Sequence, residues 1–75
     1  MTTRRQRRDD ALDSLTDHLA QVGLEEAVAE VRCDRKAGTC VVVPDAVPRS
    51  RWAFFLAEVE GWAYGEGLRV EVEEP

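Results

Sequence analysis

The stretch RWAFFLAEVEGWAY, residues 51–64, decides how this chain folds. Its apolar side chains recur every three or four residues, which predicts a helix with one broad buried face. That face consists of Trp52, Phe55, Leu56, Val59, Trp62 and Ala63. The opposite side carries small residues at four-residue spacing with an aromatic residue beside them. We call this side the strip, and it consists of Ala53, Phe54, Ala57 and Gly61.

The strip has two interpretations. Helices that cover a sheet need small residues where they touch, so the strip could pack against another helix of the same monomer. Alternatively it forms an interface with a second copy or another protein. A small domain needs only one apolar face for its own core, and Phe54 is the kind of large anchor that interfaces use. We therefore favour the interface.

Alternating apolar and polar residues on both sides of this helix predict three strands. Residues 68–72 form one strand after the helix, and residues 27–34 and 39–43 form a hairpin before it. In the hairpin, residues 36–38 are expected to form the loop, with Gly38 in the left-handed conformation.

A first helix is expected after Asp9 or Asp10, either of which can cap it. Its apolar positions are Leu12, Leu15, Leu19 and Val22. Gly23 is expected to end it in the left-handed conformation, with Leu24 folding back onto it. For the helix over residues 51–64, Ser50 and Asp45 remain alternative caps, and Gly65 and Gly67 are expected to end it.

These elements predict an α+β fold in the order α-β-β-α-β, with two helices packed on one face of a three-stranded sheet. Residues 1–8 are expected to form a basic flexible arm, and residues 9–75 a single domain. The sheet residues expected to face the helices are Val31, Cys33, Val41, Val43, Leu68, Val70 and Val72. An open strand edge offers a second seam for dimerisation.

Size and composition narrow the class of protein. With 44% hydrophobic and 33% charged residues, the chain of 75 residues is typical of a globular domain. A chain this small buries only roughly 60% of its unfolded surface, so its stability is marginal and a homodimer would help. Nine arginines against one lysine are typical of a high-GC genome and favour a bacterial origin. No segment is apolar enough to span a bilayer or to form a secretory signal, so we expect a cytoplasmic protein.

The meaning of Cys33 and Cys40 depends on the hairpin register. If Arg35 opposes Thr39, Cys33 faces Val41 and the two thiols point to opposite sides of the sheet. If Arg35 pairs with Gly38 instead, the cysteines lie directly opposite each other, where a disulfide becomes conceivable. We prefer the first register because it turns two valines inward, and free thiols are usual in the cytoplasm.

The sequence contains few residues that could catalyse a reaction or bind a metal or cofactor. His18 is the sole histidine, which leaves too few partners for a zinc site beside two cysteines. Ser14 lies one turn away from it, but a serine and a histidine alone are not a triad. The phosphate-binding, nucleophile-elbow and zinc-protease motifs are absent from the sequence. We therefore expect no enzyme activity, no metal, no cofactor and no small-molecule substrate.

The charge of the chain is uneven. Its formal net charge is −5, yet the first eight residues hold four arginines and no acid. These arginines, Arg4, Arg5, Arg7 and Arg8, could attract nucleic acid through its phosphates. The remaining 15 acidic and six basic residues make the body acidic, which fits a solvated surface or a decoy that imitates phosphates.

The sequence favours a small acidic, non-enzymatic module that regulates by protein contact and forms a homodimer through the strip or a strand edge. One alternative is an accessory nucleic-acid-binding regulator that uses the arginine arm. Another is an acidic decoy that inhibits a nucleic-acid-handling protein.

Overall fold

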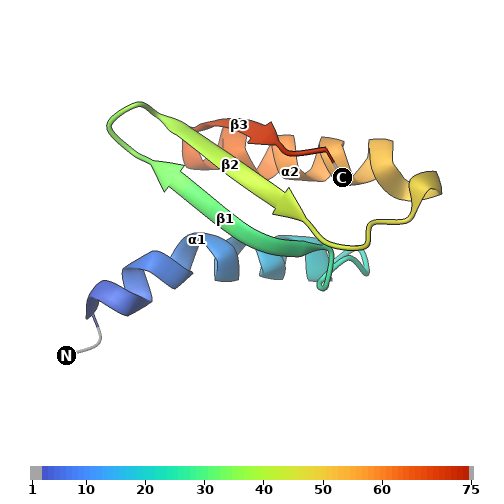
Figure 1. Cartoon of the computed structure of the whole chain (residues 1–75), viewed down its shortest axis with the longest axis horizontal. Coiled ribbons are helices and arrows are strands. Elements are labelled where there is room, and N and C mark those ends of the chain that lie inside the picture. The colour runs from blue at the N-terminus through green and yellow to red at the C-terminus, as the bar shows by residue number, and fades with distance from the viewer. Residues whose placement is uncertain (1–2, 75) are drawn as a thin grey trace.

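The predicted element order is confirmed. A computed structural model describes residues 3–74, with the side chains of residues 11–74. The elements are α1 (Thr3–Ala20), β1 (Val28–Asp34), β2 (Thr39–Pro44), a 3-10 turn η1 (Arg49–Arg51), α2 (Trp52–Glu66) and β3 (Arg69–Val72). The strand order is β1-β2-β3, with β2 antiparallel to β1 and parallel to β3 (Figure 1).

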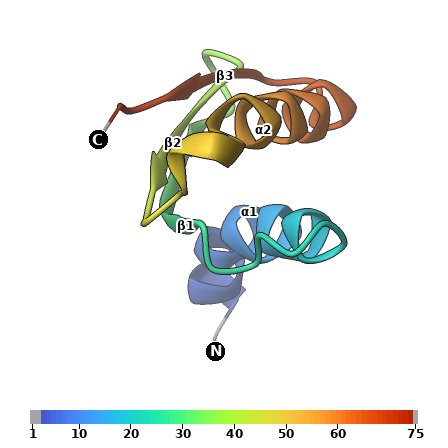
Figure 2. The same ribbon diagram turned by 90° about the vertical axis from the view of Figure 1, so that its right-hand side faces the viewer.

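Both helices lie on one face of the sheet, which confirms the predicted α+β architecture (Figure 2). The core lies between the two layers, and its fully buried side chains include Phe55, Leu15, Leu19, Val42 and Val59. The face of α2 that was predicted to be apolar supplies four of the ten core residues that are buried among the described side chains. Trp52 and Leu56 from the same face pack against this core while partly exposed.

Each helix ends at a glycine in the left-handed conformation. Gly23 follows α1 with φ 78°, and the N–H of buried Leu24 donates to the carbonyl of Leu19 at 2.9 Å. This arrangement is the predicted glycine cap with its hydrophobic contact. Gly67 ends α2 in the same way with φ 75°, whereas Gly65 lies inside the helix instead of helping to end it.

Helix α1 begins earlier than predicted. It starts at Thr3, so Asp9 and Asp10 lie inside the helix and the prediction that either caps it is wrong. Arginine is a good helix former, and residues 3–8 contain neither glycine nor proline to interrupt the helix. The backbone of these residues therefore continues α1 where a separate arm was expected.

The start of α2 also differs from the prediction. Pro48 precedes η1 with an extended backbone, and Arg51 occupies the N-cap position of α2. Ser50 lies within η1, so it is not the cap. Asp45 lies before η1, and its backbone N–H donates to the carbonyl of Ala27 at 2.7 Å. Proline fixes the approach to the helix here, because its φ suits the first turn.

The hairpin between β1 and β2 does not have the preferred register. Cys33 pairs directly with Cys40, and four residues rather than three connect the strands. The side chain of Asp34 favours this turn, because its Oδ1 accepts the backbone N–H of Lys36 at 3.1 Å and of Ala37 at 3.2 Å. Gly38 ends the loop with φ 71°, as predicted.

This register reverses the faces of β2. Val41 and Val43 lie on the outer face of the sheet, so the prediction that they face the helices is wrong. Cys40 and Val42 take their place in the core, with 1% and 0% of their surface exposed. The expectation of free thiols pointing apart is also wrong, since Cys33 and Cys40 form a disulfide.

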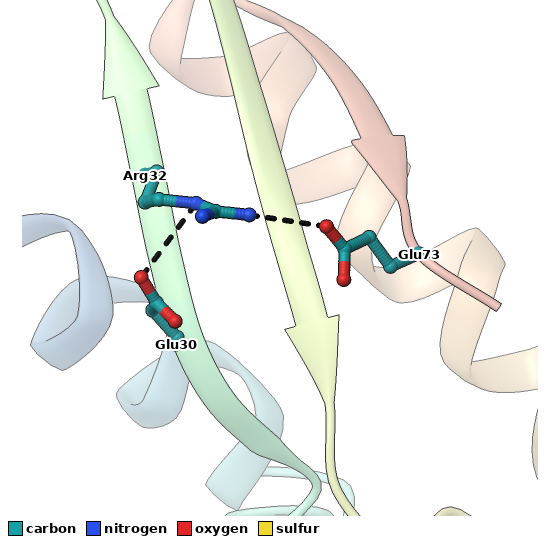
Figure 3. A network of polar contacts seen from close by, with 3 residues as sticks. All are labelled: Glu30, Arg32 and Glu73. Atoms are coloured by element: carbon teal, nitrogen blue, oxygen red, sulfur yellow. Dashed lines mark hydrogen bonds and ion pairs between the residues drawn. The ribbon is translucent and has the colours of Figure 1, made fainter. Parts of the chain in front are cut away.

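The outer face of the sheet carries no helix in the described part of the chain (Figure 2). A polar network crosses it, as Figure 3 shows. Arg32 on β1 reaches over β2 and donates to Glu73, which follows β3, at 3.0 Å, and its Nε lies 3.6 Å from Glu30. The guanidinium therefore lies across the central strand, where it limits access to the outward valines.

Candidate functional site

The strip predicted on α2 is exposed to solvent. All four of its residues are exposed, and 40% of the Phe54 surface is accessible. Helix α1 therefore does not cover the strip. Packing against another helix of the monomer was the alternative interpretation of the strip. It lies on the side of α2 opposite the buried residues Phe55 and Val59.

Tyr64 extends the strip by one turn and was missed by the sequence reasoning. It lies three residues after Gly61, a spacing that places two residues on the same side of a helix. Its side chain is 87% exposed, the larger of the two values among the large hydrophobic residues exposed in the described part. We call the strip together with Tyr64 the α2 face. The three-residue spacing was visible in the sequence and could have identified it.

Two glycines lie within α2, and the monomer gives no packing reason for either. A Cβ built at Gly61 or at Gly65 meets no described atom within 4 Å apart from the helix's own backbone. Their backbone is helical, so neither position needs a left-handed conformation. A glycine inside a helix costs about 1 kcal/mol relative to alanine. The close approach of something outside the monomer would account for Gly61.

Arg51 fixes Phe54 at one border of the α2 face. Its guanidinium carbon lies 5.2 Å from the centroid of the Phe54 ring, within the range of a cation–π contact. The same guanidinium donates to the carbonyl of Val22, after α1, at 3.2 Å. These two contacts of Arg51 restrain the Phe54 ring at the border of the α2 face.

Two polar contacts set the position of α2 against α1. The indole N–H of Trp62 donates to Ser14 Oγ at 2.9 Å, and His18 Nε2 lies 3.0 Å from Glu58 Oε1. Ser14 and His18, which the sequence placed one turn apart, thus bind different residues of α2. Both contacts lie on the α1 side of α2 and leave the α2 face free.

A shallow groove borders the α2 face at the N-terminal end of the helix. It is lined by Val47, Arg49, Trp52, Ala53 and Glu74. Val47, Trp52 and Ala53 supply its apolar part, and Arg49 and Glu74 add one positive and one negative group. The sequence did not predict it, because it brings together the loop before α2 and the segment after β3, which are far apart in the chain. Ala53 belongs to both the groove and the strip.

Metal binding, the arginines of residues 4–8 and membrane spanning are the remaining points. Within residues 11–74, whose side chains are described, no three histidine, cysteine or acidic residues lie close enough to hold a metal ion. The backbones of Arg4, Arg5, Arg7 and Arg8 belong to α1, but their side chains lie outside the described part, so their binding to nucleic acid stays a prediction. None of the helices described is both long and apolar enough to cross a membrane.

Comparison of the chain with protein-family models, with curated proteins and with solved structures found no match in any of the three.

Proposed function

We propose that this chain is a small acidic, non-enzymatic regulatory module that acts by protein contact, and that it forms a homodimer through the α2 face. The observation that supports the proposal is the exposure of every residue of this face, two of them aromatic, on a helix whose other side packs against the core. Large exposed apolar patches, especially those bordered by polar residues, often mark binding surfaces.

The energetics of a small chain favour such a contact. A domain of this size has little apolar surface to bury, so burial of Phe54 and Tyr64 adds stability that the monomer lacks. Gly61 makes α2 less stable, and no packing within the monomer compensates for this loss. A glycine is expected at such a position where a second helix comes close.

The outer face of the sheet is a weaker candidate for the interface. Arg32 and Glu73 form an ion pair across the outer face of the sheet, so a partner that bound there would have to break or bury this pair. Burying such a pair carries a desolvation penalty that can exceed its attraction. The α2 face imposes no comparable penalty, since its five residues carry no charge.

The substitution Ala57→Glu tests the proposal at the centre of the strip. It places a charge in the middle of the interface, so the dimer should dissociate, while an exposed helical position tolerates glutamate in the monomer. Sedimentation equilibrium over a range of concentrations measures the result. Ala20→Glu, on the exposed end of α1, is the matched control and should leave the dimer intact. The same mass for wild type and Ala57→Glu at every concentration would refute the proposal.

We also propose a cytoplasmic location, which the Cys33–Cys40 pair makes testable. Disulfides are uncommon in that compartment, so the pair should be reduced there for most of the time. Alkylation of thiols in intact cells, followed by mass spectrometry, measures the reduced fraction. A fully oxidised pair would place the protein in an oxidising compartment.

A further inference from the structure

We infer that the two α2 helices of the dimer run antiparallel, and that each copy inserts its Tyr64 into the groove of the other. This inference rests on the proposed function, because it requires that the partner at the α2 face is a second copy. The groove is the one lined by Val47, Arg49, Trp52, Ala53 and Glu74.

The spacing along α2 supports this arrangement. Ala57 is the middle residue between Ala53 and Gly61, so a two-fold axis beside it makes the strip self-complementary. Tyr64 lies seven residues after Ala57. Under this symmetry it comes level with residue 50 of the other copy, beside Arg49 and Ala53. A parallel pair would instead bring the two Tyr64 side chains together and leave both grooves empty.

The chemistry of the groove fits a tyrosine side chain. Val47, Trp52 and Ala53 can contact the ring, and a guanidinium such as that of Arg49 stacks well on an aromatic face. The carboxylate of Glu74 can accept the phenol O–H, so the polar tip of Tyr64 would not be buried without a partner. Tyr64 is 87% exposed in the monomer and is therefore free to make this contact.

The centre of the strip is complementary in shape. Phe54 precedes Ala57 by three residues and Gly61 follows it by four. Antiparallel pairing brings the aromatic ring of each copy against the glycine of the other, where no side chain blocks it. The open space around Gly61 in the monomer is consistent with this role.

Charge favours the antiparallel orientation as well. Arg51 precedes the first turn of α2, whereas the exposed Glu60 lies just past the middle of the helix. Antiparallel pairing brings Glu60 of each copy closer to Arg51 of the other than parallel pairing does. Parallel pairing would align like charges and like helix dipoles.

The first test measures the dissociation constant of the dimer for Tyr64 variants by sedimentation equilibrium. Two symmetric contacts are lost in Tyr64→Ala, so the constant should rise by about a hundredfold, or about tenfold for each contact. Tyr64→Phe and Glu74→Gln should each raise it a few-fold. The double variant should be no weaker than the weaker single variant, because both remove the same hydrogen bond.

The second test measures orientation with a short bis-maleimide cross-linker. Copies carrying Ser50→Cys are mixed with differently tagged copies carrying Gly65→Cys, which keeps Tyr64. Cys33 and Cys40 are joined in a disulfide and do not react. Antiparallel pairing should link the two kinds of copy. The two substituted residues 65 would lie about 24 Å apart in the antiparallel dimer, so the Gly65→Cys copies should not link to each other.

The outcomes separate this inference from the proposed function. Suppose that Ala57→Glu dissociates the dimer, but Tyr64→Ala leaves the constant unchanged or Gly65→Cys copies link to each other. The inference is then wrong and the proposed function stands. Failure of Ala57→Glu to dissociate the dimer, or a wild type that is monomeric throughout, refutes both.

Discussion

Trp62 contributes both packing and a hydrogen bond between the two helices. Its side chain is almost fully buried, and its indole N–H is satisfied by Ser14 Oγ at 2.9 Å. Ser14→Ala leaves this N–H without its partner, which should lower the free energy of unfolding by about 1–3 kcal/mol. Urea denaturation followed by tryptophan fluorescence measures it. In a Trp62→Phe background the same serine substitution should have little effect, and full additivity would contradict the role of the bond.

The disulfide between Cys33 and Cys40 stabilises the hairpin. It closes a short loop, since the two residues are seven positions apart. The chain-entropy relation for a loop of this length gives a stabilisation of about 2–3 kcal/mol. A reducing agent should therefore lower the free energy of unfolding of the wild type by this amount, as measured by chemical denaturation. A Cys33→Ala/Cys40→Ala variant is the control and should not respond to the reductant.

The cysteine register shows where prediction from sequence reached its limit at single residues. Residues 39–43, Thr-Cys-Val-Val-Val, are apolar on both faces of the strand, so shifting the register by one residue leaves an apolar face inward in either case. The preference for turning Val41 and Val43 inward was opposed within this strand only by Thr39, a small polar residue on the same face. The turn around Asp34 fits the observed register, because Asp34 Oδ1 accepts two backbone N–H groups of the loop, and these hydrogen bonds form only once the loop has folded.

At the scale of elements, Gly61 affects the stability of the α2 helix and the packing of the dimer in opposite ways. Gly61→Ala should separate these two effects. The added methyl group meets open space and the backbone is helical, so the isolated monomer should gain up to about 1 kcal/mol of stability. The same methyl group would obstruct Phe54 of the second copy and weaken the dimer. Thermal unfolding at high dilution measures the first effect, and sedimentation equilibrium measures the second.

Gly67→Ala is the contrasting substitution at the end of the same helix. Its backbone is left-handed, with φ 75°, so alanine there should destabilise the monomer by about 1 kcal/mol. It lies outside the α2 face and should leave the affinity of the folded copies unchanged.

If Gly61→Ala strengthened the dimer, the close approach of a second helix at residue 61 would be ruled out.

The types and order of the elements were predictable because their signals are local. The periodicity of residues 51–64, the alternation in residues 68–72 and the glycine after each helix depend on neighbours in the chain. Helix starts were less predictable. Asp9 and Asp10 look like caps, but the helix-forming arginines before them carry α1 back to Thr3.

At the scale of the whole molecule, the candidate site was predictable only where it lies on one helix. The strip follows from helical spacing, and its exposure follows from the apolar residues on the other side of α2. The groove could not be predicted in this way, because Val47 and Glu74 come together only when the sheet has formed. An interface that includes both the strip and the groove can therefore be recognised only in the folded structure.

The net charge of the molecule predicts how the dimer responds to salt. Two copies of charge −5, with centres about 20 Å apart, repel each other by about 5 kcal/mol in water before screening. This separation is in keeping with the shorter dimensions of the chain, 24 and 21 Å. The Debye length is about 30 Å at about 0.01 M salt and about 8 Å at about 0.15 M, so most of the repulsion disappears over this range.

Contacts between Arg51 of one copy and Glu60 of the other act in the opposite direction. Exposed pairs of this kind contribute only about 0.2–1 kcal/mol each, so the screened repulsion should dominate. We therefore expect the dissociation constant of the dimer to fall by about tenfold between about 0.01 and 0.15 M sodium chloride, as measured by sedimentation equilibrium.

The direction in which salt changes the dissociation constant distinguishes the proposed dimer from the alternatives that depend on phosphate chemistry. Arginines that bind nucleic acid release counterions, and an acidic decoy in a basic groove relies on attraction, so both kinds of binding weaken as salt rises. An apolar face between two acidic copies should behave in the opposite way. A dimer that dissociated as salt increased would be held together by charge, and the uncharged α2 face could not be its interface.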